Sequence, residues 1–151
     1  MASKMDTVTA RIVALMNGLS FDYPVSVFDG PMVGKAVPAN MILVGDDGDP
    51  ESDVRSTFTQ AYSNLSRTRK TEVGEIPCAV ITWSGSTEIN VRRDRAFEML
   101  AVLELAVMTN PTLGDESLYA ELVSGESEPN QNQTGSAVTV PFTIRYWATL
   151  S

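Results

Sequence analysis

The sequence predicts a single mixed domain in which two amphipathic helices combine with several short strands. Its 151 residues are a length typical of one domain, and we find neither an internal repeat nor a linker. Apolar residues recur at helical spacing in two segments. Several shorter segments are either continuously apolar or alternate between apolar and polar residues, which is typical of strands.

The first helix is predicted over residues 6–18. Asp6 or Thr7 can cap its start, and Gly18 can end it in a left-handed turn. Its apolar face is formed by Met5, Val8, Ile12, Leu15, Met16 and Leu19.

The second helix is predicted over residues 91–108, after a capping Asn90 and before Asn110-Pro111. Its apolar face is formed by Ala96, Phe97, Leu100, Leu103 and Val107, and is widened by Val102, Leu105 and Ala106. We expect the two helices to pack on the same sheet and to bury Ile12, Leu15, Phe97, Leu100 and Leu103.

Extended segments lie between and after the helices. Residues 25–28 precede a turn signal, and residues 41–44 form an apolar run typical of a buried strand. Residues 54–65 fit a helical face or a strand, and their threonine, valine and aromatic content favours the strand. Strands are also predicted over 72–83, 118–123 and 138–146. Pro141 cannot donate a ladder bond, so the last strand lies at an edge or has an unpaired flank.

The composition excludes several classes of function. Nineteen acids against eleven bases give a formal charge of −8, which argues against nucleic acid as a tightly held ligand. The absence of histidine removes Ser-His-Asp and Cys-His catalysis and histidine metal sites. One cysteine, Cys78, leaves no internal disulfide, and its place in an apolar strand predicts a buried, inert thiol. No targeting signal or membrane span is expected.

Two polar segments are predicted to be loops. The first, residues 46–53, holds five acids, namely Asp46, Asp47, Asp49, Glu51 and Asp53. It lacks the ligand spacing of a calcium loop, so a solvated loop or an interface is favoured over a metal site. The second, residues 125–136, is predicted to be a mobile hairpin loop that becomes ordered against a partner, and it contains Glu126, Glu128, Asn130, Gln131, Asn132 and Gln133.

Basic residues gather in two places. Arg67, Arg69 and Lys70 form the only basic run before the second helix. Arg92, Arg93 and Arg95 crowd the first turn of that helix, where the helix dipole disfavours cations. Pairing with nearby acids in the same chain is one interpretation. The other is contact with acids of a neighbouring subunit, because residues 96–144 contain seven acids and no base. Head-to-tail contacts between unlike patches make rings when the rotation closes.

The order of these segments resembles the tail terminator proteins of long-tailed, siphovirus-like bacteriophages, especially those that infect actinobacteria. A helix precedes Phe28-Asp29-Gly30-Pro31, and the run Met41-Ile42-Leu43-Val44-Gly45-Asp46-Asp47-Gly48 follows. Then come Ile76-Pro77-Cys78-Ala79-Val80-Ile81-Thr82-Trp83-Ser84-Gly85, an Arg-rich helix start, Asn110-Pro111-Thr112-Leu113-Gly114 and an alternating final strand. The resemblance covers nearly the whole chain, although Asp115-Glu116-Ser117 stands where small residues are expected.

The resemblance implies an α+β fold with two main helices on a largely antiparallel sheet. It also implies a non-enzymatic virion protein without a cofactor. Such a protein forms a hexameric ring on the head-proximal end of the tail tube, is assembled in the host cytoplasm, and contacts the tail tube protein and a neck or head-completion protein. DNA passes through the lumen without being bound, and no membrane is involved. The alternatives are a head-completion or stopper protein of the neck, a tail tube protein, or a small acidic metal- or ligand-binding domain.

Overall fold

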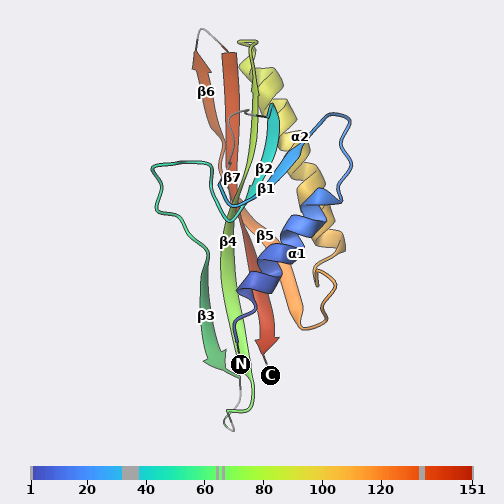
Figure 1. The fold of residues 1–151 in the computed structure, drawn as a ribbon, viewed down its shortest axis with the longest axis vertical. Helices are drawn as coiled ribbons and strands as arrows, with labels where there is room; N and C mark the ends of the chain where they lie inside the picture. The colour runs from blue at the N-terminus through green and yellow to red at the C-terminus, as the bar shows by residue number, and fades with distance from the viewer. Residues whose placement is uncertain (1, 32–37, 64, 66, 133–134, 151) are drawn as a thin grey trace.

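The computed structural model describes residues 2–31, 38–63, 65, 67–132 and 135–150. These residues form an α+β fold of two helices and a seven-stranded, mostly antiparallel sheet (Figure 1). In chain order the elements are α1 (Met5–Asn17), β1 (Ser26–Asp29), β2 (Asn40–Val44), β3 (Thr57–Tyr62), β4 (Lys70–Ser84), α2 (Ile89–Thr109), β5 (Leu118–Gly125), β6 (Glu128–Asn132) and β7 (Gly135–Leu150). No helix in the described part of the chain is long and apolar enough to cross a membrane.

Two long antiparallel strands, β4 and β7, form the centre of the sheet and pair along their whole length. The outer side of β4 is shared by two strands: β3 pairs with residues 70–75 and β2 pairs with residues 78–82. The outer side of β7 is likewise shared by two strands: β6 pairs with residues 135–139 and β5 pairs with residues 142–148. β1 extends the sheet beyond β2 through its one parallel pairing within the described residues. Among the described residues, the short strands β1, β3, β5 and β6 therefore each have one edge without a partner strand.

Both helices lie on one side of the sheet, as expected (Figure 1). Val8, Ile12 and Met16 of α1 share one core with the buried face of α2 and with alternate residues of β7. β7 shows strict alternation of buried and partly exposed residues along 135–148, which confirms the alternating pattern predicted over 138–146.

The predicted core is right in part. Ile12 and Leu103 are fully buried, whereas Leu15 and Leu100 are only partly buried. The predicted burial of Phe97 is wrong, because 43% of this residue is exposed. α2 is apolar almost all round, and its contact face is formed by Ala96, Met99, Leu103, Ala106 and Val107. Phe97 lies about 100° round the helix from Ala96 and so points away from the centre of that face.

The helix ends correct three local predictions. Neither Asp6 nor Thr7 caps α1; its N-cap residue is Lys4, and the Ser3 hydroxyl accepts a bond from the Met5 N–H at 3.1 Å. Gly18 is right-handed, with φ of −83°, so it does not end the helix in a left-handed turn. Asn90 lies inside α2, which begins one residue earlier with Glu88 as its N-cap.

The polar segment 125–136 is mostly a strand, so its prediction as a loop is wrong. Its residues 128–132 form β6, which pairs with β7 from Glu128↔Thr139 to Asn132↔Gly135. Pairing with a long, regular strand overrides the low strand preference of the amide residues. Strands are confirmed at β2, β4, β5 and, within the ambiguous residues 54–65, at β3.

Pro141 lies in a central strand rather than at an edge. The alternative prediction, an unpaired flank, holds only locally, because β7 pairs with β4 on one flank and with β5 and β6 on the other. Pairing is interrupted only between Thr139 and Phe142, at the junction between β5 and β6, where the Pro141 carbonyl accepts a bond from the Glu126 N–H. The nitrogen and oxygen of one strand residue point to the same side, so the imide nitrogen of Pro141 faces this junction, where the ladder is interrupted.

Candidate functional site

The acidic segment 46–53 is a loop, as predicted, and its carboxylates bind their own backbone. Asp46, Asp47 and Asp49 each accept a hydrogen bond from the N–H two residues further on, at 2.7, 3.0 and 2.9 Å. Glu51 and Asp53 are exposed. Across the described ranges, no three possible histidine, cysteine, aspartate or glutamate ligands come close enough to hold a metal ion.

This acidic loop also covers the face of the sheet opposite the helices. Met41, Leu43 and Ala79 form a small second core there, with Phe28 and Ile81 packed against it. A Cβ at Gly48 would lie 3.0 Å from the Ile81 side chain, so the loop lies close to this cluster. Gly48 has φ of +81°, which side chains rarely adopt, and glycine therefore suits both the turn and the close approach.

The three arginines of α2 are not equivalent. Arg92 donates to the Thr82 hydroxyl at 3.1 Å, and burial together with nearby Arg95 lowers the pKa of Arg92. Arg95 lies over the Tyr23 ring, with its Cζ 3.6 Å from the ring centroid. Arg93 is exposed, and its side chain makes no ion pair or hydrogen bond with the described residues. The predicted pairing with nearby acids is absent from this part of the chain, and only Arg93 remains a simple candidate for contact with a neighbour.

The second segment predicted to contact a partner, residues 125–136, contains β6 and the start of β7, which pair with each other. Glu126 and Glu128 are exposed, and Asn130, Gln131 and Asn132 contribute backbone to β6. Gln133 lies outside the described residues.

A buried carboxylate that the sequence analysis did not single out lies on the helix side of β4. Glu72 is fully buried and accepts hydrogen bonds from the Tyr146 hydroxyl at 2.7 Å, the Gln60 amide at 2.7 Å and the Lys4 N–H at 3.0 Å. Burial opposes its charged form, but these bonds and one from Ser3 outweigh burial and lower the pKa of Glu72. Both oxygens are engaged, so Glu72 anchors the chain rather than facing a substrate.

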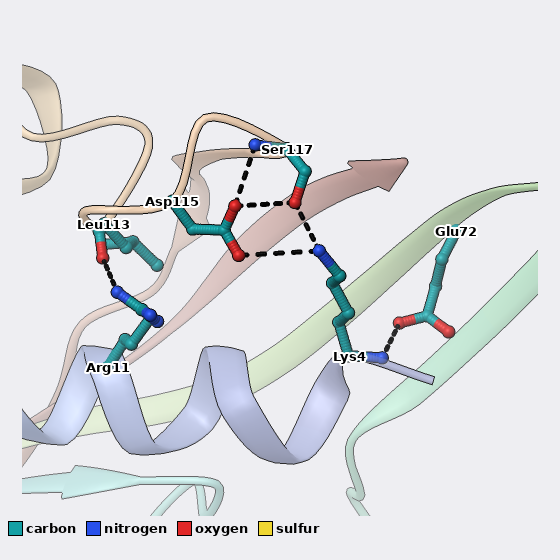
Figure 2. A network of polar contacts seen from close by, with 6 residues as sticks. All are labelled: Lys4, Arg11, Glu72, Leu113, Asp115 and Ser117. Atoms are coloured by element: carbon teal, nitrogen blue, oxygen red, sulfur yellow. Dashed lines mark hydrogen bonds and ion pairs between the residues drawn. The ribbon is translucent and has the colours of Figure 1, made fainter. Parts of the chain in front are cut away.

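Glu72 belongs to a polar network that ties the N-terminal segment to two other parts of the fold (Figure 2). The ammonium group of Lys4 contacts Asp115 and donates to the Ser117 hydroxyl, while Arg11 donates to the Leu113 carbonyl at 2.8 Å. Hydrogen bonds from Ser117, followed by the charge of Lys4, lower the pKa of Asp115 to about 2. The residues that depart from the resemblance, 115–117, are thus held in a defined turn.

Cys78 is fully buried, as predicted, and burial raises the pKa of its thiol to about 12. A thiol in that state is unreactive near neutral pH.

Several large exposed apolar side chains lie at two places near the edges of the sheet, while Trp83 and Val91 are exposed elsewhere. One is the outer flank of α2 and neighbouring β5, where Phe97 and Met108 are 43% and 70% exposed. Two hollows of about 420 and 290 Å³ lie there, and both are lined by Glu104 and Leu122. The other place is β3 and the turn after it, where Phe58 and Tyr62 are about half exposed. Exposed apolar patches on a folded domain mark sites of interaction.

No model of a known protein family matches the chain, and no curated protein is significantly similar to it in sequence.

Proposed function

We propose that this protein is a structural subunit of a bacteriophage virion. It forms a ring on the head-proximal end of the tail tube, ends polymerisation of the tube and joins the tail to the neck. In this role it is not an enzyme and needs no cofactor. It assembles in the host cytoplasm, and its partners are further copies of itself, the tail tube protein and a neck protein.

The observation that carries the proposal is where the apolar surface lies. Phe58 and Tyr62 on one edge of the sheet, and Phe97 and Met108 beside the other edge, leave 43–70% of their surface exposed. A protein that binds a small molecule gathers apolar and polar groups in one deep pocket. Apolar surface on two opposite sides suits a subunit with a neighbour on each side.

The specific role comes from the order of sequence segments that resembles tail terminators, and the α+β fold agrees with that resemblance. The net charge of −8 is compatible with a ring around DNA, because carboxylates facing the lumen would repel phosphates and leave the DNA free to pass.

Electron microscopy of the purified full chain tests the proposal. Closed rings are expected, and added rings should cap one end of preformed tail tubes. Tails produced without the chain should be longer than normal and should not join heads. Long tubes formed by the chain itself would instead identify a tail tube protein. A ring that joins heads but leaves tail length unchanged would identify a neck protein, and a monomer without effect on tails would overturn the proposal.

A further inference from the structure

One edge of the sheet carries a surface that is both basic and aromatic. We call it the basic arm and define it by the side chains of Phe58, Tyr62, Arg67, Arg69 and Lys70. Phe58 and Tyr62 pair with Gly74 and Lys70 in the β3–β4 ladder, next to Glu72 on the inner face, so both rings lie on the helix side of the sheet.

The charges of the basic arm are not neutralised within the described chain. The ion pairs found there are Lys4–Asp115 and Arg145–Glu75, and neither involves the arm. The Lys70 ammonium lies 5.0 Å and the Arg67 guanidinium 5.7 Å from the centroid of the Tyr62 ring. The arm therefore presents cations gathered around a half-exposed ring.

The opposite edge carries a surface of the opposite charge. We call it the acidic groove, and it is the pair of adjoining hollows between α2 and β5. Its apolar lining includes Phe97, Leu100, Met108 and Leu122, and its acids are Glu104 and Glu126. Glu121 alternates with the core residues Ala120 and Leu122 and pairs with Arg145, so its side chain lies on the other face of the sheet. No base occurs anywhere in residues 96–144, so no cation from this stretch offsets those acids.

The two surfaces lie where a head-to-tail contact needs them. In the half of the sheet that holds residues 70–75, the strand order is β3, β4, β7 and β5, so β3 and β5 are its two edges (Figure 1). The arm's rings and α2 both lie on the helix side. Two arms placed together would repel each other, and so would two grooves, whereas an arm against a groove is attractive. Such a contact between unlike surfaces repeats from copy to copy, and it closes into a ring when the rotation between neighbouring copies completes a full turn.

We propose that the basic arm of one copy docks into the acidic groove of the next. Phe58 and Tyr62 cover the apolar lining, and Arg67, Arg69 and Lys70 approach Glu104 and Glu126 of the neighbouring copy. The contact rests on the proposed function in that it is the joint between subunits of the ring. Arg92 and Arg95 have partners within the chain, so the basic arm takes their place as the main basic surface of the interface between subunits.

Charge reversal tests the contact directly. One full-length variant carries Arg67→Glu and Arg69→Glu, and a second carries Glu104→Lys and Glu126→Lys. Each should self-associate roughly tenfold more weakly than the wild type or worse, as measured by analytical ultracentrifugation, because like charges then face each other. Mixing the two variants should restore assembly, since every arm then has an oppositely charged groove available. Circular dichroism confirms that each variant is folded.

A matched control changes net charge without touching the groove. Glu51→Lys with Glu88→Lys reverses two exposed acids outside the groove and should assemble like the wild type. Contact between unlike surfaces is tested by a short bismaleimide cross-linker on Tyr62→Cys and Met108→Cys chains. Cross-linked dimers should form when the two variants are mixed, and each variant alone should give none, because Cys78 is buried.

The outcomes separate this contact from the proposed function. If the wild type assembles and both charge-reversed variants assemble equally well, the arm–groove contact is wrong and the ring proposal is untouched. Cross-links in the unmixed samples would also overturn it, since they require like surfaces to meet. If mixing restores assembly but the particles do not cap tail tubes, the contact stands and the tail-terminator role fails. A wild type that stays monomeric overturns the contact.

Discussion

Gly74 is the position where a single added methyl group should do most damage. It lies in the middle of β4, and a Cβ there would stand 2.2 Å from Cε1, 2.4 Å from Cζ and 2.6 Å from the hydroxyl oxygen of Tyr146. Carbon atoms in contact normally stay about 3.5–4 Å apart, so the ring must move by more than about 1 Å. Tyr146 is fully buried and its hydroxyl donates to Glu72 at 2.7 Å. Moving the ring therefore breaks the bond that satisfies a buried carboxylate.

The expected cost of Gly74→Ala follows from these two effects. Overpacking a core costs about 1–3 kcal/mol, and losing a hydrogen bond to a charged group costs about 1.5–3 kcal/mol. We expect the free energy of unfolding to fall by about 3–5 kcal/mol, which is a large part of the stability of an ordinary domain. For a chain of this size the thermal midpoint should drop by roughly 10 °C.

Chemical denaturation followed by circular dichroism measures this loss. The matched control is Gly18→Ala, because Gly18 has φ of −83° and a Cβ there would meet nothing closer than 3.5 Å. That variant should be unchanged or more stable by about 0.4–1 kcal/mol. A Gly74→Ala protein within about 1 kcal/mol of the wild type would refute the packing described around Tyr146.

Three further predictions concern the core, the response to acid and the thiol. Leu103→Ala should cost about 2–5 kcal/mol in urea unfolding, whereas Leu105→Ala, at a residue 60% exposed, should change stability by less than about 0.5 kcal/mol; equal losses would contradict the assigned face of α2. Folding lowers the pKa of Glu72 and Asp115, so the stability that each carboxylate contributes is present above its ordinary pKa of 4.5 or 3.8. That stability is lost as the pH falls through the lowered pKa, which for Asp115 is about 2. Acid titration of the unfolding midpoint should show this decline, and Asp115→Asn should make it shallower. Cys78 should react with a thiol reagent only after the protein is unfolded, and rapid labelling of the folded chain would show that it is accessible.

Much of the fold could be predicted from local pattern, where one periodicity dominates. The alternation in β7 and the apolar run in β2 each allow a single interpretation, and both are confirmed. In α2 apolar residues surround the helix, so spacing alone did not distinguish Phe97 from the buried Met99. β6 was missed because its polar residues favour a loop, and only pairing with β7 makes them a strand.

The candidate surfaces were less predictable, because they depend on residues far apart in the sequence. The run Arg67, Arg69 and Lys70 was visible, but nothing local placed it at a sheet edge opposite β5. The partners of Arg92 and Arg95 come from β4 and from the segment after α1. Glu72 could have been noticed as an acid two residues from Gly74 on the buried face of β4, a position where a charge requires partners.

The mass of the native particle tests the central claim most directly. Sedimentation or native mass spectrometry of the purified full chain should give a single closed assembly, six times the 16.4 kDa subunit mass if the ring matches the hexamer of tail terminators. The mass should stay constant as the protein concentration rises, because a closed ring has no free end to extend. A 16.4 kDa monomer at every concentration, or a particle that grows without limit, would contradict the ring.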